Sequence, residues 1–306
     1  MTEDRFLHQL FPRLGAMPAE VVVGPGDDCA AVRARPGRLL LLAVDQVVGD
    51  RHYRLAGPDA DPPALAGRKL LARNLSDIAA MGGVPLHALV AATLGPGQDE
   101  AWLNAFFDGM LELARATGVT LIGGDLARAP HDTVASLTIT GEVADAEIKL
   151  RSGARPGDIF LATGGFGNSF PTRHHLTFTP RLREGRLLAR HPGVHAMMDV
   201  SDGLFLDASR ICRASNVTLR LDPARIPLRT PQTTIAQALG DGEDYELILA
   251  ADPVTAAALE QTWPFPDVPL TRLGEFRAPD AAGPQVTGPR GEPLQPGHAG
   301  FDHFQE

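Results

Sequence analysis

The sequence predicts a protein of the α/β (α+β) class with two domains. Its 306 residues exceed the size at which a single hydrophobic core usually stops growing. Apolar stretches of strand length alternate with longer stretches in which apolar residues recur at helical spacing. A turn-rich segment, 151–157, lies near the middle of the chain. We therefore expect an N-terminal domain over residues 1–148 and a C-terminal domain over residues 149–306.

Apolar periodicity and flanking turn residues place the elements of the first half. An acidic first turn followed by apolar residues at helical spacing predicts a helix over 2–14. A second helix begins near Pro63 and ends before Gly82. The expected helices are 2–14, 63–81 and 99–117, and the expected strands are 38–45, 86–94, 119–123 and 133–143.

The second half continues the alternation with shorter elements. The expected strands are 158–163, 196–200, 217–221 and 245–250, and the expected helices are 181–190, 204–214, 231–239 and 253–262. The tail from about residue 277 is rich in glycine and proline, which favours irregular structure.

Composition and charge argue against several classes of protein. Apolar residues make up 44% and charged residues 21% of the chain, as in ordinary globular proteins. The net charge of −9 repels phosphate backbones and argues against a nucleic-acid binder. No apolar run approaches the roughly 20 residues of a membrane span, and the acidic start does not resemble a signal peptide. Because Cys29 and Cys212 cannot form a disulfide framework, we expect a reducing, cytoplasmic location.

An aspartate beside glycine or another small residue recurs at the end of apolar segments. The five occurrences lie at 26–28, 44–45, 74–77, 123–125 and 199–203. Taken singly, each is more often a turn or helix-cap aspartate. Taken together, they favour a ligand site at the strand ends, where α/β domains build such sites. Converging carboxylates need a countercharge, and oxygen ligands favour Mg²⁺ over Zn²⁺. Several Mg²⁺ ions suit a polyphosphate substrate.

Other motifs that carry phosphate or nucleophile chemistry are weak or missing. The sequence has no Walker A pattern, no protein-kinase motif set and no Gly-x-Ser-x-Gly elbow. The segment Gly164-Gly165-Phe166-Gly167 is only a weak glycine-rich signal. The pair His174-His175 suggests a metal, but a solvated loop is the favoured interpretation.

Seven short motifs follow one another along nearly the whole chain. They are Gly-Asp-Asp-Cys-Ala-Ala-Val (26–32), Asn-Leu-Ser-Asp-Ile-Ala-Ala-Met-Gly (74–82), Gly-Gly-Asp (123–125), Leu-Arg-Ser-Gly-Ala-Arg-Pro-Gly-Asp (150–158), Asp-Val-Ser-Asp-Gly-Leu (199–204), Gly-Glu-Asp-Tyr-Glu-Leu (242–247) and Gly-Phe-Asp-His-Phe (300–304). In this order they resemble the thiamine-monophosphate kinase family. The resemblance implies the two-domain AIR-synthetase-like fold, a homodimer that pairs through its N-terminal sheets, and a C-terminal domain over the nucleotide. It also implies direct in-line transfer of the ATP γ-phosphoryl group to thiamine monophosphate, without a covalent nucleophile.

The resemblance further implies roles for individual residues. The implied Mg²⁺ ligands are Asp27, Asp45, Asp77, Asp125, Asp199 and Asp202. The implied nucleotide-binding residues are Gly124, Asp125, Arg151 and Ser201, and the implied substrate residues are His52, Glu243 or its neighbour Asp244, and Phe301. Asp28 is interpreted as a structural hydrogen-bond acceptor and not as a metal ligand.

The sequence departs from the family pattern at three places. Val44 stands where the family usually carries threonine, and Arg51 adds a charge beside His52. The span 165–180 is altered, with Pro171 disfavouring a helix. Two alternatives therefore stay open: a kinase of the same fold that acts on another phosphorylated metabolite, and a non-catalytic paralogue that binds nucleotide. The full set of aspartates argues against the second.

Overall fold

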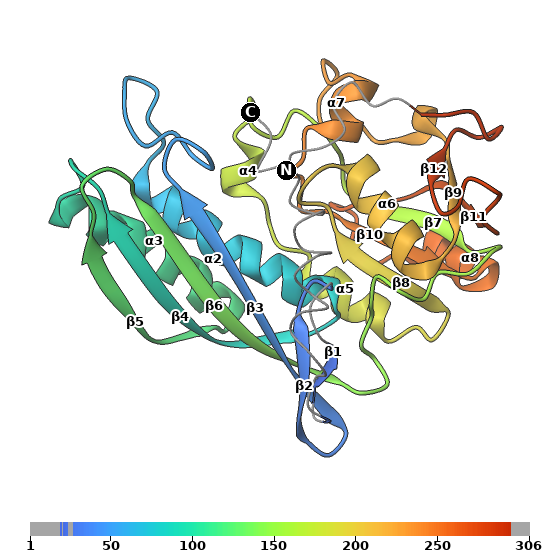
Figure 1. Ribbon diagram of the computed structural model, residues 1–306, viewed down its shortest axis with the longest axis horizontal. Helices are drawn as coiled ribbons and strands as arrows, with labels where there is room; N and C mark the ends of the chain where they lie inside the picture. Colours follow the sequence, from blue (N-terminus) through green and yellow to red (C-terminus); the bar gives the residue numbers. More distant parts are fainter. Residues whose placement is uncertain (1–18, 20, 24–26, 295–306) are drawn as a thin grey trace.

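Two six-stranded sheets with their helices form the two halves of the molecule (Figure 1). The computed structural model describes residues 19, 21–23 and 27–294, so the helix expected over 2–14 and Phe301 lie outside the described residues. The α/β class expected from the sequence is confirmed, while the boundary after residue 148 stays a prediction. Every helix in the described ranges is too short or too polar to cross a lipid bilayer.

The first sheet has the strand order β1-β2-β3-β6-β4-β5. Its strands are β1 (Val21–Val23), β2 (Ala30–Arg35), β3 (Arg38–Val48), β4 (Val84–Leu94), β5 (Thr120–Arg128) and β6 (Val134–Ala144). Only β4 and β5 run parallel, because the helix α3 (Glu100–Thr117) crosses over between them. This crossover makes β5 an edge strand, and almost every residue of β5 is exposed.

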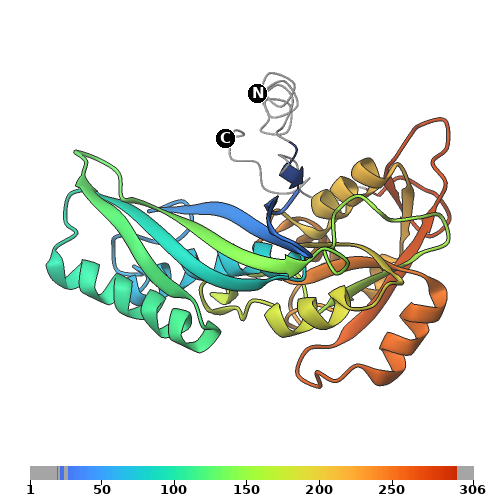
Figure 2. The same ribbon diagram turned by 90° about the horizontal axis from the view of Figure 1, so that it is seen from below.

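The described helices cover one face of this sheet. Leu39, Leu41 and Val47 alternate along β3 and are buried in one core with α2 (Pro63–Ala80) and α3. The residues between them point to the opposite face, which carries no helix from the part of the chain that the structure describes (Figure 2). On that face Val44 is 66% exposed and Leu89 is 46% exposed, so the sheet presents apolar side chains to the outside.

The second sheet has the strand order β12-β9-β11-β7-β10-β8 and is covered on both faces. Its strands are β7 (Ile159–Thr163), β8 (Val194–Asp199), β9 (Thr218–Leu221), β10 (Leu247–Ala251), β11 (Leu270–Arg277) and β12 (Val286–Thr287). Every residue of β7 and β10 is buried. Phe160 packs into a core with α6 (Leu204–Ser215) and α7 (Ile235–Gly240), whereas Leu161 packs into another with α5 (Leu182–Ala189) and α8 (Pro253–Thr262).

The helices and strands expected in the described part are confirmed, with differences of a few residues at their ends. The strands β1, β2, β11 and β12 were not predicted. The expectation of a solvated loop at His174-His175 is wrong, because a short helix, α4 (His174–Thr177), places His175 in a buried position. Its ring stacks on Phe170 at 4.2 Å between centroids. Burial lowers the pKa of both histidines to about 4, so both rings are neutral at pH 7.

Helix α2 packs against both halves of the molecule. On one side Gly67 allows contact with α3, since an added Cβ would lie 1.8 Å from the Phe106 carbonyl oxygen. Near the other end Gly185 of α5 approaches α2, where an added Cβ would lie 2.2 Å from the Ala79 carbonyl oxygen. Ala80 belongs to a core of the second half. The side chains of α2 are therefore held in fixed positions between the two sheets.

We expect Gly67→Ala to destabilise the protein, although alanine is the better helix former. Glycine to alanine in a helix interior normally stabilises by up to about 1 kcal/mol. Here the new methyl group clashes with the α3 backbone, and such overpacking typically costs about 1–3 kcal/mol. Urea denaturation measures the free energy of unfolding. Asn104→Ala, at an exposed position of α3, is the control and should cause no loss. An increase in stability for Gly67→Ala would contradict the close helix contact.

Candidate functional site

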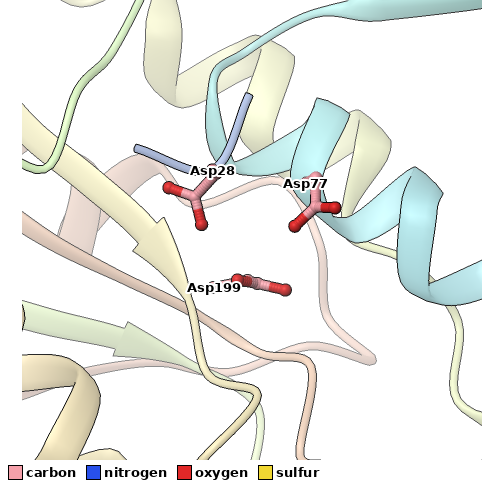
Figure 3. A group of neighbouring side chains, drawn as sticks. All are labelled: Asp28, Asp77 and Asp199. Atoms are coloured by element: carbon pink, nitrogen blue, oxygen red, sulfur yellow. The ribbon is translucent and has the colours of Figure 1, made fainter. Parts of the chain in front are cut away.

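Three aspartates from three separate elements bring their carboxylates together between the two halves. Asp28 precedes β2, Asp77 lies in the last turn of α2, and Asp199 ends β8. One oxygen from each side chain lies within 4.8 Å of the others, and the three point toward a common centre (Figure 3). The structure thus brings together Asp77 and Asp199, two of the implied Mg²⁺ ligands, whose metal role stays a prediction.

Burial and mutual repulsion make the ionised forms of these carboxylates costly. Burial raises the pKa of Asp77 well above its usual value, and Asp45 and Asp199 raise it further. Burial, together with Asp28, has the same effect on the pKa of Asp199. The donor set holds only carboxylate oxygens within reach of one point, which suits a hard divalent cation. The residues therefore fit the Mg²⁺ that the sequence implied.

Arg151 joins the cluster as a fixed positive charge. Its Nε and Nη2 donate to the two oxygens of Asp28 at 3.1 and 2.8 Å, while its backbone N–H donates to Asp27 at 3.2 Å. Burial raises the pKa of Asp27 to about 7, with Asp28 as the next largest cause. Asp28 is thus the hydrogen-bond acceptor that the sequence indicated, and it is also a member of the cluster. Its position directly after Asp27 in the Gly-Asp-Asp motif was the available signal for its place in the cluster.

A second group of polar residues connects the cluster with a neighbouring cavity. Ser76 donates to Asp199 at 2.5 Å. Ser201 and Asp202 follow Asp199 in sequence and line the cavity. Asp45, on β3, faces α2 and accepts a hydrogen bond from Arg73 at 3.1 Å. Burial raises the pKa of Asp45, Arg73 lowers it, and Asp202 raises it. Asp45 therefore interacts electrostatically both with Asp77 of the cluster and with Asp202 of the cavity wall.

The cavity has a volume of about 330 Å³ and is lined by residues of both halves. Of the predicted substrate residues, His52 and Glu243 line it. Asp244 does not, because its carboxylate is buried and accepts from Gly167 N and from Arg229 Nη2, each at 2.9 Å. Burial raises the pKa of Asp244 to about 7. Aromatic side chains, Phe170 and Tyr245, complete the wall, so part of the altered span 165–180 belongs to the cavity.

A buried lysine fixes one wall of the cavity. The side chain of Lys69, on α2, is 0% exposed, and its Nζ donates to both carboxylate oxygens of Glu243 at 2.7 and 2.8 Å. The same Nζ donates to the His52 carbonyl oxygen at 2.6 Å. Burial lowers the pKa of Lys69 to about 8, against the effect of Glu243. Glu243 itself has φ +53°, a conformation unusual for a residue with a side chain.

Sequence reasoning missed Lys69 and Arg73, which form a polar stripe on α2 together with the predicted Asp77. Lys69, Arg73 and Asp77 follow one another at intervals of four, which places them on one face of a helix. Charged residues repeated at this spacing on an otherwise apolar helix were the available signal. Their partners could not be predicted, because Glu243 lies 174 residues away in the chain.

Asp125 does not join the cluster within one chain. It lies on β5, and the pairing Asp125–Ala91–Ser136–Gln46 places it three strands from β3, about 14 Å away. Directly paired residues share a face of the sheet, so Asp125 points to the open face with Gln46, opposite to Asp45. The role of Asp125 as a ligand of Mg²⁺ and nucleotide stays a prediction. At Gly124 an added Cβ would lie 2.0 Å from the Val90 carbonyl oxygen, so strand packing alone requires this glycine.

The chain is similar to known proteins both in sequence and in fold. Models of AIR synthase related protein, N-terminal and C-terminal domains, match residues 26–143 and 155–278. Thiamine-monophosphate kinase of Escherichia coli strain K12 is 33% identical, over 99% of this chain and 98% of that protein. The Bacillus subtilis thiamine-monophosphate kinase is 31% identical, over 90% and 92%.

Solved structures resemble the whole chain. Thiamine-monophosphate kinase from Stenotrophomonas maltophilia matches with a TM-score of 0.74 and 30% identity, over 95% of this chain and 96% of that one. AaThiL in complex with AMPPCP and TMP matches in fold with a TM-score of 0.82 and 24% identity, over 99% and 97%.

We expect Mg²⁺ to stabilise the wild-type protein and to have little effect on an Asp77→Asn variant. Ionising a carboxylate whose folded-state pKa is raised destabilises the folded protein at neutral pH, and a cation that binds only the folded state reverses this. In EDTA the variant should therefore melt above the wild type. Thermal unfolding with EDTA or MgCl₂ measures both effects. Glu260→Gln, on the exposed side of α8, is the control. Equal Mg²⁺ shifts in all three proteins would contradict a cation site at the cluster.

Proposed function

The chain belongs to the thiamine-monophosphate kinase family of AIR synthase related proteins, and from this premise we propose that it transfers the γ-phosphoryl group of ATP to thiamine monophosphate. The observation that carries the proposal is the position of the cavity directly beside the carboxylate cluster. The cavity suits the organic part of a substrate. The cluster suits cations that accompany phosphate groups. The product is thiamine diphosphate.

Asp28, Asp77 and Asp199 are the residues proposed to hold Mg²⁺, with Asp27, Asp45 and Asp202 as further ligands around them. Bound Mg²⁺ would neutralise charge on the transferred phosphoryl group and its neighbours. Arg151 supplies a permanent charge beside the same carboxylates. Phosphoryl transfer depends mainly on positioning and electrostatics, so the acceptor oxygen of the substrate needs no protein nucleophile.

The remaining assignments concern binding. Ser201 and Arg151 lie beside the cluster and are proposed to contact the nucleotide, together with Gly124 and Asp125. His52 and Glu243 are proposed to contact thiamine monophosphate, and Phe301 is assigned to the same role from the family pattern alone. We propose a cytoplasmic enzyme on the strength of its family and composition.

In a dimer, Asp125 of one chain could contribute to the site of the other chain. The open face of the first sheet exposes the apolar side chains of Val44 and Leu89. Apolar surface of this kind marks an interaction site. We therefore propose a homodimer that covers this sheet, in which the Asp125 of one chain serves the site of the other.

Incubation with ATP, Mg²⁺ and thiamine monophosphate should yield ADP and thiamine diphosphate in equal amounts. Chromatography resolves the two thiamine esters. Asp77→Asn should lower kcat at least about 100-fold, the scale on which preorganised electrostatic groups act. Glu260→Gln should retain full activity. Turnover of a different monophosphate without any turnover of thiamine monophosphate would show instead that this scaffold serves another phosphorylated metabolite.

Mixing two inactive variants tests the shared site. If Asp125 acts across the dimer, half of the dimers formed from equal Asp77→Asn and Asp125→Asn chains are mixed, and each holds one intact site. Co-refolded chains should then recover about a quarter of wild-type activity. Each variant refolded alone is the control. A mixture no more active than its parents would show that Asp125 acts within its own chain or not at all.

A further inference from the structure

Arg73 presents a buried guanidinium at the junction of the cavity and the carboxylate cluster. Its side chain is 11% exposed and lines the cavity. Nη1 donates to the Gln46 carbonyl oxygen at 2.9 Å, and Nη2 donates to Asp45 at 3.1 Å. Two contacts from β3 thus hold the plane of the guanidinium in place. The roles proposed above do not include Arg73.

These contacts leave the guanidinium with donors to spare. An arginine has five N–H groups, and the two hydrogen bonds to β3 use two of them. Nε is buried and has no acceptor among the described residues. A buried arginine that lacks acceptors is costly by itself. An anion that enters the cavity would supply them.

The charges around Arg73 show why such a cation is needed there. Asp45, Asp202 and Glu243 surround this end of the cavity. The ammonium of Lys69 is already shared between Glu243 and the His52 carbonyl. A phosphate group at this end would meet three carboxylates, and Arg73 is the buried guanidinium on the cavity wall that can face it.

The reaction requires the acceptor phosphate at this end of the cavity. For in-line transfer, the phosphate of the substrate must lie next to the nucleotide phosphates, and these lie with the cations at the cluster. Arg73 stands between the two regions. The planar fork of a guanidinium matches two phosphate oxygens, which a point charge does not.

We propose that Arg73 binds the phosphate of thiamine monophosphate and is the residue that selects the phosphorylated substrate over free thiamine. The proposal rests on the proposed function. It adds to that function a specificity-determining residue on α2, the helix that also carries Asp77 and Lys69.

The test compares two ligands on three proteins, by calorimetry with Mg²⁺ and a non-hydrolysable ATP analogue. The wild type should bind thiamine monophosphate more tightly than thiamine. Arg73→Met should weaken thiamine monophosphate binding about 10- to 100-fold, as for loss of a charged hydrogen bond, and should change thiamine binding less than about twofold. Arg73→Lys should lie between them, because it keeps the charge but loses the fork.

A matched arginine on the same helix provides the control. Arg68 donates to the carbonyl oxygens of Leu176 and Phe178 and does not line the cavity. Any effect of Arg68→Met acts through structure and should change the affinities for both ligands by the same factor. If Arg73→Met likewise weakens both ligands equally, or weakens neither, Arg73 has no role in phosphate selection.

A measurement on the unmodified protein covers the case in which the variants do not fold. In ¹⁵N–¹H spectra of arginine side chains, the Arg73 resonances should shift on addition of thiamine monophosphate and stay in place with thiamine. Equal responses to both ligands would overturn the proposal. If the wild type turns over no thiamine monophosphate, the proposed function fails as well. If turnover is normal and phosphate selection survives in Arg73→Met, only the role of Arg73 fails.

Discussion

The packing of helix α2 between two sheets is the constraint on which the rest of the structure depends. Gly67 lets α3 approach one side of the helix, and Gly185 lets α5 approach the other. With backbones in such close contact, the helix cannot rotate or slide without clashes. Its polar side chains therefore keep fixed positions, and each meets its partner from a different part of the chain. Positioning of this kind is what phosphoryl transfer asks of a protein.

Acidic and basic side chains form pairs in the site, and this pairing makes their burial tolerable. Asp28 is matched by Arg151, Asp45 by Arg73, Glu243 by Lys69, and Asp244 by Arg229. Buried charges of one sign are tolerated when a partner lies in hydrogen-bond distance, and breaking such a pair is costly. Burial, and after it the neighbouring carboxylates, raise the pKa of Asp77 and Asp199, so the ionised forms of both are costly without a further cation. This cost arises where cations are proposed to bind.

Sequence reasoning worked where the signal is local. The period of apolar residues and a glycine stop predicted α3 almost to its ends, and the C-cap Gly118 is left-handed, with φ +76°. The strand β11 escaped prediction because Gly274 and charged residues interrupt its apolar pattern. Motif order predicted most of the site, including Asp77 and Asp199. It could not predict that Asp125 faces away from them, because that depends on register across four strands.

The distances along the chain between partners bear on how the protein is made. Ser76 meets Asp199 across 123 residues, and Lys69 meets Glu243 across 174 residues. During synthesis the first sheet and α2 leave the ribosome long before these partners exist, so the charged face of α2 stays hydrated until the second sheet has formed. A nascent chain that ends before Gln237 lacks one side of the cavity wall, including Glu243 and Tyr245. The site is therefore complete only late in translation, after most of the polypeptide has been synthesised.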